Sequence, residues 1–319
     1  MARNKAQKSE NLNQPRLKIT HMKRSFIDRI HDRLWTITGD WLDIKRPLSS
    51  VESVTADDGS ISGTMDWPRA CTALVSGEWT SKNFRRLHAV RQVVETLGPV
   101  DGRHFGRWIR NNASSYLTDQ RVAAVDTWGD PIRWPAACLG TPRSFSPTTL
   151  RFLAHALWLK KKGLVKEGGT VVEIGVGFGG LAAMNAIVSN ATTIMIDLPP
   201  VAEASMLQMR ELGLGDFASN DHSKAKSSDV CFISNYAFTE LSRDLQDEYA
   251  DQFIRHADRG VILSNAAVFA GHMRSRNNNQ IIELLSKHGI HAKAESERSI
   301  LCTSDRHHGN VIVGWGLKF

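Results

Sequence analysis

A glycine-rich segment carries the clearest chemical signal in the chain. Residues 171–180 read VVEIGVGFGG, an apolar run that breaks into glycines. Between a buried strand and a helix, such glycines permit a tight turn, allow the backbone to approach a ligand closely and leave the first helical amides facing it. This chemistry fits a cofactor that contains a nucleotide. The glycines that carry the pattern are Gly175, Gly177, Gly179 and Gly180.

The glycine spacing alone fits two cofactors. With Gly180 as its third glycine, the segment matches the dinucleotide fingerprint G-x-G-x-x-G. Read from Glu173 to Gly179, it matches the pattern of S-adenosylmethionine (SAM) methyltransferases. Asp197 does not decide between them. It ends the next apolar run, 18 residues after Gly179, where a carboxylate can accept the ribose hydroxyls of either cofactor.

Glu173 favours SAM. It lies near the end of a strand that a doubly wound sheet should bury, and burial of an unpaired carboxylate is costly. The ammonium group of SAM would compensate this charge, directly or through water, whereas the pyrophosphate of a nicotinamide cofactor would be repelled by it. Only 139 residues follow Gly180, too few for a second nucleotide-binding half and a substrate domain. The sequence therefore predicts SAM as the cofactor.

The elements that position these residues begin at Ser146-Pro147, an N-cap followed by proline at the first helical position. A helix is expected to run through LRFLAHALWLKKK to Gly163. Strand and helix patterns then alternate, which predicts a doubly wound parallel α/β sheet. The last two strands are close enough for a hairpin that adds one antiparallel strand at the end of the sheet. Strands are expected at 170–174, 192–196, 216–219, 229–233, 260–264, 291–298 and 310–318, and helices at 178–189, 200–212, 239–257 and 276–288.

The first 145 residues follow another pattern. Residues 1–24 predict a basic, flexible arm, and residues 25–145 a mainly helical acceptor-binding or lid region that precedes the SAM domain at 146–319. Helices are expected at 82–98 and 102–116. Seven of the nine tryptophans precede residue 135. They fit the core of a helical unit or the walls of an acceptor cleft.

The charge of the chain lies mostly in this arm. Of the formal net charge of +7, residues 1–33 contribute +6. The basicity is therefore a property of the arm and not of a face of the fold. It leaves open a contact with nucleic acid or another acidic partner.

The composition indicates an ordinary core-forming chain, with 41% hydrophobic and 23% charged residues. No run approaches the roughly 20 apolar residues of a membrane span, and no secretory signal begins the sequence. We expect a cytoplasmic protein, and a homo-oligomer is left open. The four cysteines are far apart, which excludes a C-x-x-C metal or disulfide framework. No local acidic cluster predicts a metal, so Mg²⁺ is left open.

From residue 145 to 319 the chain resembles a family of sugar O-methyltransferases grouped with a nanchangmycin-cluster enzyme. The matching segments are VVEIGVGFGGLA (171–182), IDLPPV (196–201), FISNYAFTELSRDLQDEYADQFI (232–254), NVIVGWG (310–316) and TTLRFLAHALWLKK (148–161). The resemblance implies a class I methyltransferase fold, which is Rossmann-like, with seven strands and a helical N-terminal extension. It further implies transfer of a methyl group to a hydroxyl of a sugar or glycosylated small molecule.

The resemblance also places residues at the methyl group. Ser234 and Asn235 would pass under the sulfonium of SAM, with Tyr236 orienting the acceptor or the cofactor. At the exit of the third strand, Asp221 is the candidate for adenine recognition.

Methyl transfer to a hydroxyl needs an aligned acceptor oxygen and a group that removes its proton. Glu240, one turn into the helix after the fourth strand, is the first candidate for this base. His272, in the loop AGHMRSR after the fifth strand, is the second. His222 and the pair His307-His308 are further candidates.

Two other functions remain open. The basic arm could deliver RNA or another nucleic acid as the methyl acceptor, with steep salt dependence. Alternatively, the fold could serve as a catalytically inactive scaffold. Binding of SAM separates the scaffold from the enzyme.

Overall fold

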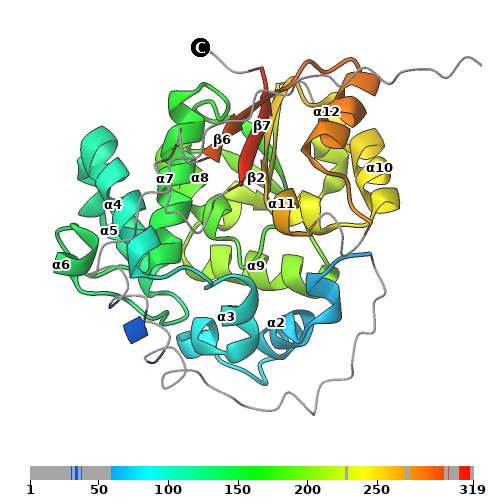
Figure 1. Ribbon diagram of the computed structural model, residues 1–319. Helices are drawn as coiled ribbons and strands as arrows, with labels where there is room; N and C mark the ends of the chain where they lie inside the picture. The colour runs from blue at the N-terminus through cyan, green and yellow to red at the C-terminus, as the bar shows by residue number, and fades with distance from the viewer. Residues whose placement is uncertain are drawn as a thin grey trace, which may run out of the picture.

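The computed structural model describes residues 59–226, 229–269, 274–297, 301 and 309–316, together with Ile30, Arg33, Leu34 and Ile37. A seven-stranded sheet with the order β3-β2-β1-β4-β5-β7-β6 forms its centre (Figure 1). β1 to β5 pair in parallel, whereas β7 is antiparallel to both β5 and β6. The strands are β1 (Thr170–Ile174), β2 (Thr192–Ile196), β3 (Ala218–Ser219), β4 (Val230–Asn235), β5 (Arg259–Ser264), β6 (Lys293–Ser296) and β7 (Val311–Trp315). The predicted fold class, a doubly wound seven-stranded α/β sheet, is confirmed.

The predicted antiparallel strand is β7, which lies second from the edge. β7 is buried, while every residue of the edge strand β6 is exposed. An edge strand has only one neighbour, so its sequence need not be apolar on both faces.

Helices cover both faces of the sheet (Figure 1). On one face α7 (Pro147–Lys161), α8 (Gly180–Ser189) and α9 (Pro199–Glu211) share a core with alternate strand residues such as Val171 and Ile233. On the other, α10 (Arg243–Gln252) and α12 (Asn278–Lys287) pack on the intervening residues, such as Val172 and Phe232. Further short elements are η5 (His222–Lys226), η6 (Ala237–Glu240), η7 (Ile254–His256) and α11 (Ala266–Phe269).

The single helix predicted over 239–257 is wrong. Leu241 is extended (φ −91°, ψ 153°) and separates η6 from α10, and Ser242 then caps α10 by accepting from the Leu245 amide. The start of α7 is as predicted: the Ser146 hydroxyl accepts from the Thr148 amide, and Pro147 is the first helical residue.

A helical layer formed by residues 59–145 lies outside α7, α8 and α9. Its helix α2 packs on α9, and α4 packs on α7 (Figure 1). The expected helix over 82–98 is broken, because Leu87 is extended (φ −59°, ψ 135°) and the α-helical part is short. The helices of this layer are η1 (Ser62–Thr64), α2 (Trp67–Val75), η2 (Ser81–Arg86), α3 (His88–Val93), α4 (Pro99–Ala113), η3 (Ser114–Leu117), α5 (Gln120–Thr127) and α6 (Ala136–Leu139).

Aromatic residues connect this layer to the glycine segment. Phe84 packs against Trp67 and Trp128, with ring centroids 6.0 and 5.8 Å away, and Trp128 stacks on Phe178 at 6.1 Å. Both tryptophans are buried. For Trp67 and Trp128, the prediction of a core role is confirmed.

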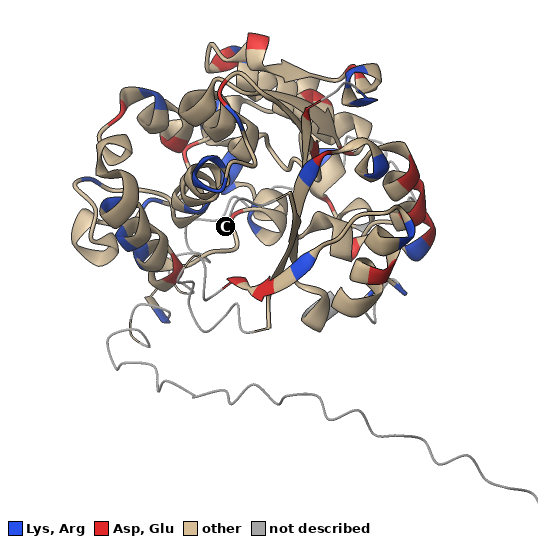
Figure 2. Cartoon of the chain, turned by 90° about the horizontal axis from the view of Figure 1, so that it is seen from above, with Lys and Arg blue, Asp and Glu red and all other residues tan. Residues whose placement is uncertain are grey.

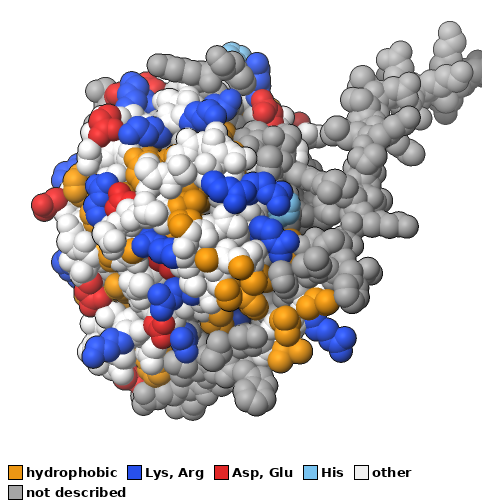
Figure 3. Space-filling model, turned by 90° about the vertical axis from the view of Figure 1, so that its left-hand side faces the viewer, with side chains coloured by type: hydrophobic (Ala, Val, Ile, Leu, Met, Phe, Trp, Pro, Cys, Tyr) orange, Lys and Arg blue, Asp and Glu red, His pale blue; other side chains and the backbone are white. Residues whose placement is uncertain are grey.

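Charged residues of both signs are spread around the described part of the chain (Figure 2). On the face shown in Figure 3, Lys and Arg side chains are separated by neutral ones. Three large apolar residues of helical conformation, Ile30, Leu34 and Ile37, are exposed. Among the described helices, none combines the length and the apolar character that a membrane span requires.

Candidate functional site

The glycine segment forms the turn between β1 and α8. Gly175, Gly177 and Gly179 have φ values of 77°, 59° and 87°, in the left-handed region that favours glycine. A Cβ on Gly175 would lie 2.0 Å from the Cβ of Ala237, in the segment after β4. The loop is therefore pressed against the end of β4, at the carboxyl edge of the sheet, where open α/β sheets bind ligands.

Asp197 follows β2 directly and contacts the same loop. Its Oδ2 accepts from the Gly177 amide at 3.3 Å, and its Oδ1 accepts from the Leu198 amide at 2.8 Å. The carboxylate is half-buried. This position, across the loop from Gly177, is the one predicted for a ribose-binding acid.

Glu173 is a buried acid without compensation. Its side chain is 2% exposed, and its Oε2 has no hydrogen-bond partner among the described residues. Burial, followed by the negative charge of Asp197, raises the pKa of Glu173 well above its usual value. An uncompensated carboxylate beside a glycine loop is suited to a cationic ligand group.

Arg151 is a buried cation whose Nε has no hydrogen-bond partner, and no sequence pattern predicted it as a site residue. It lies on α7, is 9% exposed and forms no salt bridge with a carboxylate of the described residues. Its Nε is buried without a partner, and its one hydrogen bond, to the Val94 carbonyl, is long at 3.5 Å. The guanidinium lies over the rings of Phe152 and Tyr236, at 5.3 and 5.6 Å.

Arg151 is also close to the glycine loop. Val94, whose carbonyl it contacts, would be 3.6 Å from a Cβ on Gly177, and Phe152 would be 2.4 Å from one on Gly180. A signal was present in the sequence: Arg151 and His155 are four residues apart and are the two polar residues of the segment LRFLAHALWL (150–159). Because α7 is buried along most of its length, both positions are interior.

Arg85 shows what a satisfied buried arginine looks like in this protein. It forms a salt bridge with Glu95 at 2.5 Å. It also donates to the Val125 and Trp128 carbonyls and to the hydroxyls of Ser146 and Thr149. The contrast indicates that Arg151 lacks an anion that Arg85 already has.

The end of β4 holds the three residues that the resemblance placed at the methyl group. Ser234 is buried; its hydroxyl donates to the Ile174 carbonyl at 3.0 Å and accepts from the Phe238 amide. Asn235 donates through Nδ2 to Nδ1 of His155 at 3.0 Å, and its Oδ1 is buried without a hydrogen-bond partner.

Tyr236 has a backbone conformation that is rare for a non-glycine residue (φ 71°, ψ −34°). Its amide donates to the Leu263 carbonyl at 2.8 Å, and its carbonyl accepts from the Thr239 amide at 3.1 Å. Its hydroxyl donates to Glu297 at 2.7 Å. Such conformations concentrate at functional sites.

Glu240, the first candidate for the base, lies at the end of η6. Asn265, after β5, donates to its Oε1 at 2.7 Å. Burial raises the pKa of Glu240, and this hydrogen bond opposes the shift. A raised pKa brings a carboxylate nearer to the range useful for a general base at neutral pH.

The other candidates are less favoured or outside the described residues. His222 is exposed, and its ring contacts the Met195 carbonyl at 3.2 Å and packs on Phe253. Asp221 follows β3, where adenine recognition was predicted, and accepts from the Ser223 amide and hydroxyl. These bonds lower its pKa. His272 and the pair His307-His308 lie outside the described residues.

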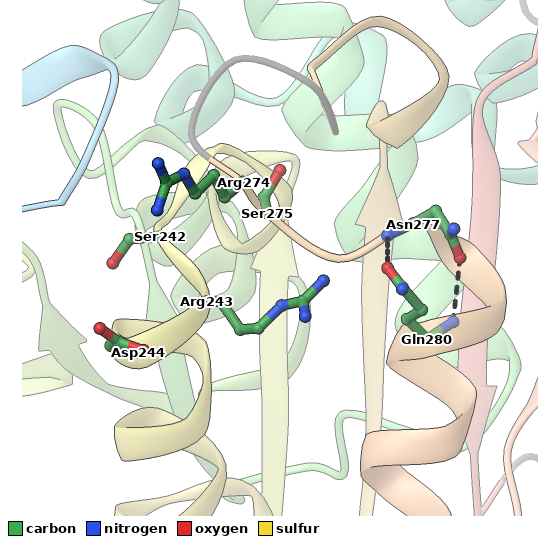
Figure 4. Close-up of a pocket in the computed structure, with 7 residues that line it drawn as sticks. All are labelled: Ser242, Arg243, Asp244, Arg274, Ser275, Asn277 and Gln280. Atoms are coloured by element: carbon green, nitrogen blue, oxygen red, sulfur yellow. Dashed lines mark hydrogen bonds between the residues drawn. The ribbon is translucent and has the colours of Figure 1, made fainter.

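A pocket of about 610 Å³ lies beside this edge, between the first turns of α10 and α12 (Figure 4). Asn277 and Gln280 cap α12 there reciprocally. The pocket contains none of the candidate residues above, and it is separate from the glycine loop. Its lining residues are Ser242, Arg243, Asp244, Arg274, Ser275, Asn277 and Gln280. Within the described ranges, no group of three or more His, Cys, Asp or Glu is arranged to hold a metal ion, and Mg²⁺ stays open.

Comparison with known proteins gives similarity of fold only. No family model and no curated protein matches the chain. A geranyl diphosphate C-methyltransferase from Streptomyces coelicolor A3(2) is 14% identical over 51% of this chain and 77% of its own, with a TM-score of 0.38. An O-methyltransferase family protein from Burkholderia thailandensis is 12% identical over 52% and 58%, with a TM-score of 0.36. The [4+2]-cyclase SpnF is 13% identical over 55% and 82%, with a TM-score of 0.39. Sequence identities and TM-scores this low establish neither a family nor a reaction for this chain.

Proposed function

We propose that the protein is a SAM-dependent methyltransferase. The observation that carries the proposal is the carboxylate of Glu173, buried without compensation directly before a left-handed glycine loop. The ammonium group of SAM would compensate it, whereas the pyrophosphate of a nicotinamide cofactor would add negative charge beside it.

Arg151 strengthens the choice of SAM. The amino-acid end of SAM is a zwitterion, with one ammonium and one carboxylate. The site offers one unpaired buried carboxylate, Glu173, and one unpaired buried guanidinium, Arg151, near the same loop. Each would receive the partner that the protein does not supply.

The remaining cofactor contacts follow the sheet edge. Asp197 would bind the ribose, the backbone turn that contains Gly175, Gly177 and Gly179 would border the cofactor, and Asp221 would lie toward the adenine. Ser234 and Asn235 would shape the floor below the methyl group. When bound, SAM supplies a methyl group on a cationic sulfonium, which is an electrophile for an oxygen nucleophile.

We propose a hydroxyl of a sugar or glycosylated small molecule as the acceptor. This rests on the resemblance of residues 145–319, above all the segment SNYAFTEL, to sugar O-methyltransferases. Glu240 and His272 are candidates for the base, and Tyr236 for orienting the acceptor. The raised pKa of Glu240 supports its candidacy.

Two measurements test this proposal. Calorimetric titration should show binding of SAM and S-adenosylhomocysteine but not of NADH. Transfer of label from methyl-labelled SAM should then be measured with methyl α-L-rhamnopyranoside, p-nitrophenyl β-D-glucopyranoside, UDP-glucose and an unstructured RNA. Failure to bind SAM would leave the scaffold function, NADH binding alone would indicate a dehydrogenase, and transfer only to RNA would replace the sugar as acceptor.

A further inference from the structure

A buried polar cluster surrounds the hydroxyl of Tyr236, the residue that follows β4. The Tyr236 hydroxyl donates to Oε1 of Glu297 at 2.7 Å. Asn310, just before β7, donates to Oε2 at 3.0 Å. Nε2 of His155 lies 3.9 Å from Oε1 of Glu297. Glu297 follows β6, so residues distant in sequence meet at one carboxylate.

The hydrogen bonds define which atoms of the cluster donate and which accept. Nδ1 of His155 faces the Asn235 amide nitrogen, which can only donate, so Nδ1 accepts and a neutral imidazole carries its hydrogen on Nε2, on the side of Glu297. The two oxygens of Glu297 accept from Tyr236 and Asn310, and Nε2 of His155, at 3.9 Å, is beyond hydrogen-bond distance. The Glu297 side chain is fully buried.

Tyr236 separates this carboxylate from the site edge. The residue is half-buried, whereas Glu297 is fully buried. Charged groups from three elements face the phenol: Glu297 beyond β6, Arg151 on α7 and Asp101 on α4. Burial, then the charge of Glu297, raises the pKa of Tyr236 well above its usual value, so the phenol is protonated at neutral pH and cannot be the resting base.

We propose that Tyr236 and Glu297 form a proton relay that takes the proton of the acceptor hydroxyl to a buried carboxylate. The relay rests on the proposed transfer of a methyl group to a sugar hydroxyl. As the acceptor oxygen bonds to the methyl carbon, the carbon–sulfur bond breaks and its electron pair stays on sulfur. The acceptor proton passes to the Tyr236 oxygen while the Tyr236 proton passes to Oε1 of Glu297. Charge balances, since the sulfonium cation and the carboxylate anion are neutralised together.

The cluster competes with Glu240 for the role of proton acceptor. Glu240 already accepts from Asn265, and Thr239 is bonded to the same amide. Tyr236 is held in its left-handed backbone conformation directly after β4, where the chain turns under the predicted methyl position. Asn310, which donates to Glu297, and His155, which is held by Asn235, are positioning residues for the Glu297 carboxylate.

The test compares Tyr236→Phe and Glu297→Gln with two matched controls. Glu295→Gln changes an exposed acid on β6, and Tyr249→Phe changes a tyrosine on α10 across the sheet. With methyl-labelled SAM and the sugar acceptors above, each relay variant should lower kcat by about 100-fold or more, and the double variant no further. SAM affinity by calorimetry should stay within about threefold of wild type.

A spectroscopic titration gives a readout that does not depend on activity. The chain has three tyrosines, so the difference between wild type and Tyr236→Phe at the phenolate absorption isolates Tyr236. Glu297→Gln should move the Tyr236 pKa back toward its usual value, and Glu295→Gln should not.

Each outcome supports or overturns the relay. If the wild type methylates a sugar and Glu297→Gln or Tyr236→Phe keeps the wild-type kcat, the relay is wrong and the proposed function stands. If Glu240→Gln lowers kcat by about 100-fold and neither relay variant does, Glu240 is the base and the relay is wrong. If the wild type transfers no methyl group to any sugar, the proposed function and the relay fail together. Should Glu297→Gln fail to fold, Tyr236→Phe, which removes only one oxygen, decides by its kcat.

Discussion

Two buried residues of opposite charge, Glu173 and Arg151, are the basis of the proposed cofactor site. Neither has a counter-ion among the described residues, although the same core contains the fully paired Arg85 and Glu95. Unpaired buried charges are strongly unfavourable. Their persistence near one loop is explained by a ligand that carries both opposite charges.

Glu173 should make both stability and cofactor affinity depend on pH. Its pKa is raised in the folded protein, so the folded state binds more protons than the unfolded state. The free energy of unfolding of the apoprotein should therefore fall as pH rises from the unfolded-state pKa through the raised one. Glu173→Gln should remove this fall, and thermal denaturation across pH measures it.

Cofactor affinity should change in the opposite direction. An ammonium group needs the ionised carboxylate, so SAM affinity in the wild type should rise through the same pH window, while Glu173→Gln should bind weakly with little pH dependence. A variant that is less stable than wild type above that window and binds SAM normally would contradict this role.

Arg151 should recognise the carboxylate of SAM. Arg151→Met should weaken SAM binding by roughly 10- to 100-fold, the loss expected for a hydrogen bond to a charged group. Decarboxylated SAM should bind the wild type with a similar loss, and Arg151→Met should no longer distinguish the two ligands. Arg107→Met, at an exposed position of α4, is the matched control and should bind both as the wild type does.

The sequence predicted the residues whose role depends on local spacing and missed those that depend on tertiary proximity. Glu173, Asp197 and the glycines belong to one strand–turn–helix unit and its neighbour, so their positions follow from the chain order. Glu297 lies after a short, exposed edge strand that gives little apolar signal. Its meeting with Tyr236 could not be inferred from spacing.

At the scale of elements, the β1–α8 turn is the part that tolerates least change. Gly175→Ala would place a methyl group against Ala237 and force a left-handed φ on a residue with a side chain. The turn should shift, with SAM affinity falling by more than about tenfold and the melting temperature falling as well. Calorimetry and thermal denaturation measure the two effects.

Gly213→Ala provides the matched control for this turn. Gly213 has a φ of 69°, but a Cβ there meets nothing within 4 Å. It should lose about 1 kcal/mol of stability from backbone strain alone and keep its SAM affinity. If both variants bind SAM as the wild type does, close packing of the loop is not needed for binding.

The parallel strands were predicted well because their apolar runs are bounded by glycine, proline and polar turns. Helix boundaries were predicted less well where side-chain contacts across the fold decide them. Leu87 and Leu241 are apolar and fit a helical pattern, yet both are extended. At Leu241 the chain pairs with Ser60, a contact that no local pattern reveals.

At the scale of the whole molecule, the helical layer and the sheet share one core. One apolar cluster includes Trp67 and Phe105 of the layer together with Leu153 of α7 and Val171 of β1. Arg85 and Glu95 extend this connection: Glu95 accepts from the hydroxyl of Ser146, the N-cap of α7. The layer and the sheet should therefore unfold together, even though their sequence patterns differ.

Glu95→Gln tests this cooperativity. The change leaves the Arg85 guanidinium buried without a counter-ion, which should cost about 3–5 kcal/mol. Because Arg85 also binds the N-cap of α7 and lies 4.6 Å from the Phe178 ring, the change should destabilise both the layer and the sheet.

Tryptophan fluorescence reports mainly the layer, and far-ultraviolet circular dichroism reports the whole chain. In urea, both signals should shift to the same lower midpoint with an unchanged slope. Asp130→Asn, which breaks the half-exposed bridge to Arg86, should lower the free energy of unfolding by at most about 1 kcal/mol. Two separated transitions in Glu95→Gln would show instead that the helical layer is an independent unit that can leave the cofactor site while the sheet stays folded.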